Sequence, residues 1–405
     1  MARTFRPQAS VVRVNGRSAE WLHRGFPWVY PVEVQSRPPS VAPGDAVRIE
    51  GPDGRGLGTG LWDDGWIAVR RFRTDDGPVD PPFLASVLEA ALRRRGASPG
   101  SPGSLVPPAT NAWRLCNAEN DGLPGVRIDV WGPEATVRLD APALAPLLPG
   151  LVASLQDLLA PRALWLGWRP DGRDRGRTFP ARQPLLWGED TGPDVEVTER
   201  GVRFVVRPRA GADAGLFTDM RDNRAWLDPL WSGRRVLNLF AYTGAFSVFA
   251  VRGGAEEVRS VDLADSVLAR AAANFRANDL PAPVLESDDT FRALDRHRRA
   301  GRTFDLIVAD PPSFSTGPSG PFSVERDLAH LTAACLRVLA PEGFLALSSN
   351  QGSLSPRAFQ EAVIRGAHKT GRDLRCVHQG TQAPDFPSAV TFPEGRYLKS
   401  MVYQA

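Results

Sequence analysis

The turn at residues 241–245 and the acid Asp262 have residue types and a spacing that could hold a nucleoside. An apolar run predicts a buried strand over 236–240, and the small residues after it allow the backbone to turn sharply and approach a ligand. A helix is predicted over 247–251. A second strand, over 257–262, ends in Asp262, where a carboxylate can accept hydrogen bonds from ribose hydroxyls. This order of elements predicts the nucleotide-binding half of a doubly wound sheet.

The glycine content of this turn indicates which ligand it suits. A dinucleotide site carries Gly-x-Gly-x-x-Gly, whose backbone N–H groups bind a pyrophosphate. This turn has a single glycine, Gly244, and therefore favours a ligand with a ribose but no phosphate. S-adenosylmethionine (SAM) is such a ligand and is the predicted cofactor. The alternatives are a nicotinamide-dependent oxidoreductase, which the single glycine disfavours, and an ordinary βαβ unit without a ligand.

A second group of residues with chemical potential follows a buried strand predicted over 304–310. Ligands of open α/β sheets bind at the carboxyl ends of the strands, so the loop 311–314 should face the same crevice as Gly244. Its two prolines fix the backbone φ angle. Asp310 then becomes a rigid hydrogen-bond acceptor, and Phe314 offers a surface for stacking. A purely structural Pro-Pro turn is the alternative.

The composition describes a soluble globular protein with two or three domains. The chain has 405 residues, of which 42% are hydrophobic and 23% are charged. No apolar run approaches the ~20 residues of a membrane span, and the N-terminus lacks the apolar core of a signal peptide. A cytoplasmic protein without membrane attachment is expected. The cysteines are scattered and the histidines do not cluster with them, so no metal site is expected. The oligomeric state is left open, with a homodimer as one candidate.

Arginine dominates the basic residues. The net charge is only +3, but among 49 basic residues only Lys369 and Lys399 are lysine. A GC-rich genome produces this bias, and arginine also suits RNA because its planar guanidinium pairs with phosphate and stacks on bases. The aromatic residues of the arginine-rich N-terminal part could either stack on RNA or fill the core of a small barrel. They include Trp28, Tyr30, Trp62 and Trp66.

The spacing of the predicted elements divides the chain into three domains. Residues 1–78 contain short strands separated by Gly, Pro and Asp and predict a small all-β module. Residues 79–190 hold a helix over 82–95, whose three terminal arginines suit the helix dipole, followed by a mixed α and β block. Residues 191–405 carry the doubly wound sheet.

Several motifs, in order, resemble one family of methyltransferases. The segments 23–30 and 43–47 are similar to a PUA domain, an RNA-binding pseudobarrel. Residues 117–125 closely resemble the Asn-x-Glu-x-Asp-Gly-Leu-Pro-Gly signature that follows the PUA domain in a family that includes the large-subunit ribosomal RNA cytosine-C5 methyltransferases. Residues 214–224 and 382–399 resemble two further family segments, and the Asp-Pro-Pro-Ser-Phe stretch resembles motif IV of SAM-dependent base methyltransferases.

This resemblance covers nearly the whole chain. It implies an α/β protein with an N-terminal β-rich PUA pseudobarrel, a small α+β middle domain and a C-terminal Rossmann-like, doubly wound methyltransferase domain. It also implies ribosomal RNA as the partner.

The resemblance and the motifs together give the candidate site. The predicted cofactor-binding residues are Phe217, Asp219, Arg221, Asn238, Phe240, Tyr242, Thr243, Gly244, Asp262, Asp289 and Asp310. The predicted catalytic residues are Asp310, Pro311, Pro312, Phe314 and Asn350. In the family that this chain resembles, an acid followed by a small residue and Phe contacts the adenine amino group, and this register selects Asp289. Asp288 is the competing choice, and helix capping by either acid is the alternative. Ala214 and Asp213 depart from the threonine and the lysine of the family segment.

Asn350 departs from the family in a way that bears on the chemistry. Cytosine C5 is not nucleophilic until a cysteine thiolate adds to C6, and the cytosine-C5 members have that cysteine where this chain has Asn350. A related domain that methylates guanine N7 has Ser-Asn-Asn there, and guanine N7 carries its own lone pair and needs only alignment with the methyl group. The sequence therefore predicts methylation of a ribosomal RNA base, with the target atom open between cytosine C5 and guanine N7. A protein that binds SAM and RNA without catalysis is the alternative.

Overall fold

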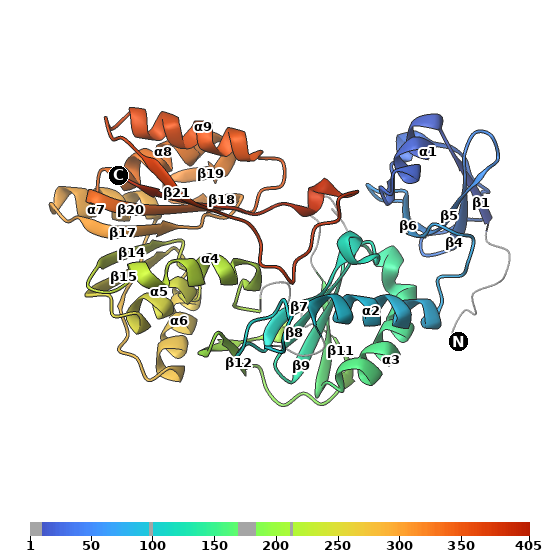
Figure 1. Cartoon of the computed structure of the whole chain (residues 1–405), viewed down its shortest axis with the longest axis horizontal. Helices are drawn as coiled ribbons and strands as arrows, with labels where there is room; N and C mark the ends of the chain where they lie inside the picture. The colour runs from blue at the N-terminus through green and yellow to red at the C-terminus, as the bar shows by residue number, and fades with distance from the viewer. Residues whose placement is uncertain (1–9, 97–99, 169–183, 211–213) are drawn as a thin grey trace. The chain divides into compact units, whose positions relative to one another are not determined.

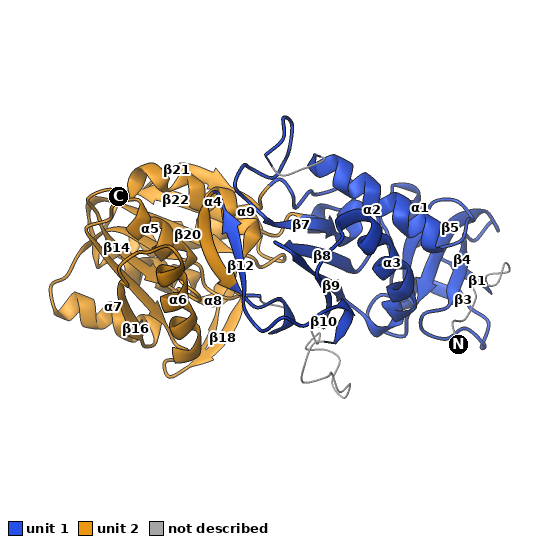
Figure 2. Cartoon of the chain, turned by 90° about the horizontal axis from the view of Figure 1, so that it is seen from below, with its two compact units in different colours: residues 1–200, 206–214, 384–395 blue, residues 201–205, 215–383, 396–405 orange. Residues whose placement is uncertain are grey.

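The chain forms two compact units (Figure 2). The computed structural model describes residues 10–96, 100–168, 184–210 and 214–405, so the predicted departure at Asp213 lies outside the described residues. Unit 1 comprises residues 1–200, 206–214 and 384–395, and unit 2 comprises residues 201–205, 215–383 and 396–405. The division into three domains at residues 78 and 190 stays a prediction.

The first sheet of unit 1 is built from short strands with a buried inner face. Its order is β2-β6-β5-β4-β1-β3, and its pairs are antiparallel except for β1 with β4. The elements are β1 (Ser10–Val14), α1 (Gly16–His23), β2 (Trp28–Val29), β3 (Val34–Ser36), β4 (Ala46–Glu50), β5 (Gly56–Trp62) and β6 (Val69–Arg73). Val12, Val47 and Ile49 are fully buried and pack with Leu22 of α1. Trp62 joins this core, whereas Trp66 is 62% exposed.

The second sheet of unit 1 has the order β11-β10-β9-β8-β7 and packs against two helices. The elements are α2 (Pro81–Arg95), β7 (Ala112–Asn117), β8 (Val126–Trp131), β9 (Glu134–Leu139), α3 (Leu148–Leu159), β10 (Ala163–Trp168) and β11 (Leu185–Gly188). Leu88 of α2 and Leu151 and Leu155 of α3 share one buried cluster with the sheet. The stretch Pro142–Leu159 has 18 residues and a mean hydropathy of 1.3, which also fits a membrane-spanning helix by length and composition. Burial of its leucines in this core accounts for that composition.

Arg95, the last residue of α2, has a partner that the helix-dipole interpretation does not explain. Its side chain is 1% exposed. The guanidinium donates to both carboxylate oxygens of Asp121, at 2.8 and 2.6 Å, and to the carbonyl oxygens of Arg114 and Asp385. Asp121 belongs to the 117–125 signature, so this signature holds the end of α2 and the C-terminal segment of unit 1 together.

Unit 2 is a doubly wound α/β domain around one large sheet. The sheet order is β16-β15-β14-β17-β20-β22-β21, and β22 is antiparallel to both of its neighbours while the other pairs are parallel. The strands are β14 (Arg235–Leu239), β15 (Glu257–Asp262), β16 (Val284–Ser287), β17 (Phe304–Ala309), β20 (Leu339–Ser349), β21 (Arg375–Gly380) and β22 (Lys399–Gln404). The helices are α4 (Arg221–Trp226), α5 (Ala245–Arg252), α6 (Asp265–Ala277), α7 (Thr290–Arg299), α8 (Val324–Leu336) and α9 (Pro356–His368).

Helices cover both faces of this sheet, with α8 and α9 on one face and α5 and α6 on the other (Figure 1). Two small hairpins complete the described strands. They are β12 (Val195–Glu199) with β13 (Val202–Val206), and β18 (Phe314–Gly317) with β19 (Gly320–Ser323). The fold predicted from the sequence is confirmed for the strand, helix and strand over 235–262 and for the strand that precedes Asp310. Because the strand order reverses at β14, the carboxyl ends of β14 and β17 form the edge where such sheets bind ligands.

Replacing Arg95 should destabilise unit 1 strongly. In Arg95→Ala the Asp121 carboxylate loses its buried guanidinium partner and keeps the half-exposed Arg94, so the variant should lose about 3 kcal/mol of unfolding free energy, the lower end of the range for breaking a buried pair. Arg93→Ala on the same helix is the matched control. Its exposed pair with Glu89 should contribute about 0–1 kcal/mol. Urea denaturation of both variants measures the difference, and equal effects would show that the buried pair has no special weight.

Candidate active site

The turn after β14 has an unusual backbone. Phe240, Tyr242 and Gly244 have φ angles of +55°, +51° and +75°. For residues other than glycine this left-handed conformation costs about 1–3 kcal/mol each, and such residues cluster where a ligand binds. A Cβ at Gly244 would also lie 3.1 Å from the Cβ of Ala271 on α6. The sequence indicated the glycine, but nothing in it signalled that two bulky residues share its conformation.

Asp262 holds this turn in place. One carboxylate oxygen accepts the backbone N–H of Tyr242 at 2.8 Å, and the other accepts the N–H of Ala264 at 3.1 Å. The side chain is only partly buried. Each carboxylate oxygen has a second lone pair, so Asp262 can stabilise the turn and also accept a ribose hydroxyl.

The segment before α4 lies against the same turn. The Thr243 hydroxyl donates to the carbonyl oxygen of Gly215, and the ring of Phe217 lies 5.3 Å from that of Tyr242, measured between centroids. Phe217 is 41% exposed and can stack on a flat ligand. Gly215 has a φ angle of +118°, a backbone conformation that favours glycine over residues with a side chain. The structure thus brings Phe217, Tyr242 and Thr243 together, and their contact with the cofactor stays a prediction.

Asn238 and Arg221 lie in the interior. Asn238 is buried and donates from its amide to the Ser247 hydroxyl at 2.8 Å, and that hydroxyl lies 2.7 Å from the hydroxyl of Ser260. Arg221 is fully buried at the start of α4. Both side chains therefore support the framework of the site, and a direct cofactor contact by either stays a prediction.

Asp289 and Asp288 have structural partners. Asp289 caps α7 and accepts hydrogen bonds from the backbone N–H groups of Phe291 and Arg292 and from the Ser319 hydroxyl. All three donors use the same carboxylate oxygen. Asp288 forms an ion pair with Arg296. The capping alternative thus describes Asp289, and its contact with adenine stays a prediction that uses the other oxygen.

Asp310 lies just after β17 beside a second acid. It accepts a hydrogen bond from the Ser348 hydroxyl at 2.5 Å. Burial, helped by the charge of Asp219, raises the pKa of Asp310 to about 6, while the hydrogen bond from Ser348 and the charge of Arg224 oppose the shift. Asp219 accepts a hydrogen bond from the Tyr397 hydroxyl at 2.7 Å. Two neighbouring carboxylates in a partly buried place favour a cationic ligand.

The loop after Asp310 meets the end of β20. The Ser313 hydroxyl donates to the side-chain oxygen of Asn350 at 2.8 Å. Pro311 is buried and Pro312 is exposed, and Phe314 begins the β18–β19 hairpin with its side chain 65% exposed. The structure therefore brings Asn350 and the Asp-Pro-Pro loop together, as expected for two parts of one site.

None of the three cysteines lies beside Asn350. Cys116 belongs to unit 1, and Cys335 is buried on α8, where burial raises the pKa of its thiol. Cys376 on β21 is paired with Tyr403, which is paired with Leu345 of β20. Asn350 lies five positions beyond Leu345 in the sequence, or about 16 Å in extended chain. Among the described residues no group of three or more His, Cys, Asp or Glu side chains could hold a metal ion.

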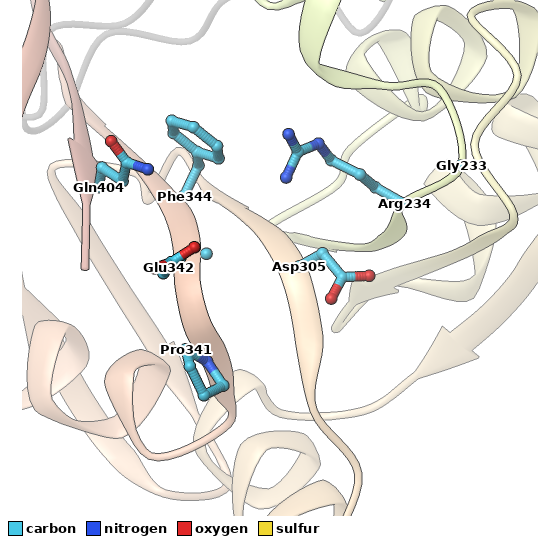
Figure 3. A pocket seen from close by; sticks show the side chains of 8 residues that line it. Gly233, Arg234, Asp305, Pro341, Glu342, Phe344 and Gln404 are labelled. Atoms are coloured by element: carbon cyan, nitrogen blue, oxygen red, sulfur yellow. The ribbon is translucent and has the colours of Figure 1, made fainter.

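A polar cavity of about 480 Å³ opens at the opposite edge of the sheet (Figure 3). Arg234, Asp305 and Glu342 contribute charged side chains to it, and the Arg234 guanidinium lies 4.9 Å from the centre of the Phe344 ring. These residues lie at the amino-terminal ends of β14 and β17 and in the first half of β20. The cavity shares no residue with the predicted site.

Comparisons with known proteins identify the class defined by this fold and site. Residues 183–403 match the family described as S-adenosylmethionine-dependent methyltransferase, and residues 12–74 match a PUA-like domain. The cofactor of this class is SAM, as predicted from the single glycine and the ribose-binding acid. The nicotinamide-dependent alternative is thereby overturned.

Relatives that match over nearly the whole length of the chain identify the family within this class. Ribosomal RNA large subunit methyltransferase I of Aeromonas salmonicida is 32% identical and covers 97% of this chain and 98% of its own length. Ribosomal RNA large subunit methyltransferase of Deinococcus radiodurans is 31% identical and covers 97% of each chain. The chain belongs to this family of PUA-containing SAM-dependent methyltransferases.

Solved structures share the fold. SMU.776, a protein assigned as a methyltransferase and crystallised with S-adenosylhomocysteine, superposes with a TM-score of 0.85 at 24% identity, covering 98% of this chain and 100% of its own. The SAM-dependent methyltransferase of Agrobacterium tumefaciens has a TM-score of 0.55 at 23% identity, covering 73% of this chain and 90% of its own.

Asp310→Asn should stabilise the protein at neutral pH. The pKa of Asp310 is about 6 in the folded chain and 3.8 as its ordinary value, so ionisation above pH 6 costs about 3 kcal/mol of folding free energy. This cost disappears as the pH falls from about 6 to 4. The variant should therefore have a higher Tm at pH 7 and lose the gain in stability between pH 6 and 4.

Asp305→Asn, at the other end of β17, is the control variant, and its expected change in Tm has the opposite sign. A hydrogen bond from Arg235 lowers the pKa of Asp305, so its ionised form stabilises the fold at neutral pH. This variant should have a lower Tm at pH 7. Thermal denaturation between pH 4 and 8 checks both, and a fall in Tm for both variants would contradict the assignment of Asp310.

Proposed function

We propose that this protein transfers a methyl group from SAM to a base of large-subunit ribosomal RNA in the cytoplasm. The names of the full-length relatives and the PUA-like domain support ribosomal RNA as the substrate. The contact between Ser313 and Asn350 carries the proposal, because it joins the Asp-Pro-Pro loop to the strand end where a base would be held.

The residues gathered at the edge of the sheet fit SAM. Asp262 would accept hydrogen bonds from the ribose, Phe217 would stack on the adenine, and Asp289 would face its amino group. Asp219 and Asp310 would attract the positively charged sulfonium and amino groups, since opposite charges nearby favour the ionised carboxylates. When bound, SAM supplies an electrophilic methyl group, and the protein has to align an acceptor atom with it.

The position of Asn350 favours an acceptor atom that carries its own lone pair. An amide cannot add to C6 of cytosine, and the thiols of the chain lie elsewhere. Guanine N7 needs only alignment and exclusion of water, which can lower the barrier by about 7–11 kcal/mol when the geometry is good. The oxygen of Asn350 is engaged by Ser313, which leaves its NH2 group to donate to an acceptor on the base edge. Guanine O6 is such an acceptor next to N7.

The target atom can be measured directly. Labelled SAM and unmodified large-subunit ribosomal RNA are incubated with the protein, and the nucleosides are analysed by mass spectrometry. We expect 7-methylguanosine. Formation of 5-methylcytidine would contradict direct transfer and require a nucleophile. Bound SAM without any methylated product would favour the alternative of a binding protein without catalysis.

Asn350→Ala should lower the rate of methyl transfer by about 100-fold, because the base loses its orientation at the reacting methyl group. The dissociation constant for SAM should stay unchanged, since Asn350 faces the base and not the cofactor. Cys376→Ser is the matched control and should keep the full rate, because its thiol lies far along the sheet. A full rate in Asn350→Ala, or a large loss in Cys376→Ser, would contradict the assignment.

A further inference from the structure

Lys399 is a buried lysine beside the catalytic strand end. It begins β22 and is paired in register with Ser349, the last residue of β20. The two strands lie side by side (Figure 2). Its side chain is 4% exposed, which is rare for lysine. Lys369, the only other lysine of the chain, is exposed after α9.

The ammonium group of Lys399 binds main-chain carbonyls. It donates to the carbonyl oxygen of Gln351 and, at 2.7 Å, to that of Tyr397. Burial lowers the pKa of Lys399 to about 8, so its charge is held against a cost of desolvation. A buried charge carries this desolvation cost and a neutral side chain does not, so we expect a role here that requires the ammonium group.

These contacts fix the residues on both sides of Asn350. Ser349 is held by its pairing with β22, and the Gln351 carbonyl is held by the ammonium group. The neighbouring residue Ser348 binds Asp310, and the Tyr397 hydroxyl binds Asp219. The segment 397–399 therefore connects the acids on the cofactor side with the asparagine on the base side.

The choice of lysine fits this geometry. A chain with only two lysines among its 49 basic residues would be expected to have arginine here. A guanidinium is a planar fork suited to carboxylates and phosphates, whereas an ammonium is compact and directs three donors around one nitrogen. Two carbonyls from separate strand ends, at Gln351 and Tyr397, match the ammonium.

We propose that Lys399 is a positioning residue that holds Asn350 in the orientation required for methyl transfer. The inference rests on the proposed function of Asn350. It assigns Lys399 no contact with the base or the cofactor. Lys399 acts through its hydrogen bond to the Gln351 carbonyl, which fixes the backbone next to Asn350.

A double-mutant cycle between Lys399 and Asn350 tests this role. Lys399→Met keeps the length of the side chain but removes the donors, and it should lower kcat by about 100-fold. The dissociation constant for SAM, measured by calorimetry, should stay within about twofold. The kcat of the double variant, Lys399→Met with Asn350→Ala, should lie within about twofold of the kcat of the less active single variant, because both changes remove the same alignment. Lys369→Met is the matched control and should keep the full rate.

The outcomes separate the inference from the proposed function. A full rate in Lys399→Met, or losses that multiply in the double variant, would overturn the positioning role while leaving Asn350 in place. A full rate in Asn350→Ala would instead refute the proposed function of Asn350 and with it this inference. If Lys399→Met does not bind SAM, Lys399→Leu, which also lacks a donor, is measured in its place. Normal SAM binding with a full rate in that variant would equally overturn the role.

Discussion

Parallel pairing of β14 with β15 and β17, and of β17 with β20, brings four strand ends to one edge of the sheet. At or directly after those ends lie the turn at 240–244, Asp262, Asp310 and Asn350. Backbone hydrogen bonds fix the register of these parallel strands, and this register alone places the side chains at the strand ends close together. What remains to be fixed locally is the shape of each strand end. Asp262, Ser348 and Lys399 do this through contacts with the next segment along the edge.

The strands and helices that carry the site could be predicted because they are strongly patterned. The strands predicted over 236–240 and 304–310 have bounds within one residue of those observed, and the strand predicted over 257–262 has the observed bounds. Turn residues were found through Gly244 and the two prolines, whose backbone preferences are intrinsic. The predicted family and cofactor are confirmed. The individual roles of the site residues stay predictions.

Features that depend on distant contacts could not be predicted. The left-handed backbone of Tyr242 is held by a hydrogen bond to Asp262, which lies 20 residues further along the chain. Burial of Arg95 depends on Asp121, and burial of Lys399 depends on the carbonyl of Gln351. The 117–125 signature helped to indicate the family, yet its acids act structurally. Glu119 accepts hydrogen bonds from the Trp28 indole and from the N–H of Gly125.

The path of the chain between the two units has a consequence for biosynthesis. Unit 1 includes residues 384–395, and β22 at 399–404 fills the gap between β20 and β21 in unit 2. A ribosome therefore has to make residues 384–395 before unit 1 possesses this segment, and residues 399–404 before the sheet of unit 2 contains β22. Domains of most multidomain proteins fold in order from the N-terminus as they are made. Here the early unit waits for Asp385 to reach Arg95 and Arg114, so the final steps of folding in both units follow the synthesis of residues 384–404.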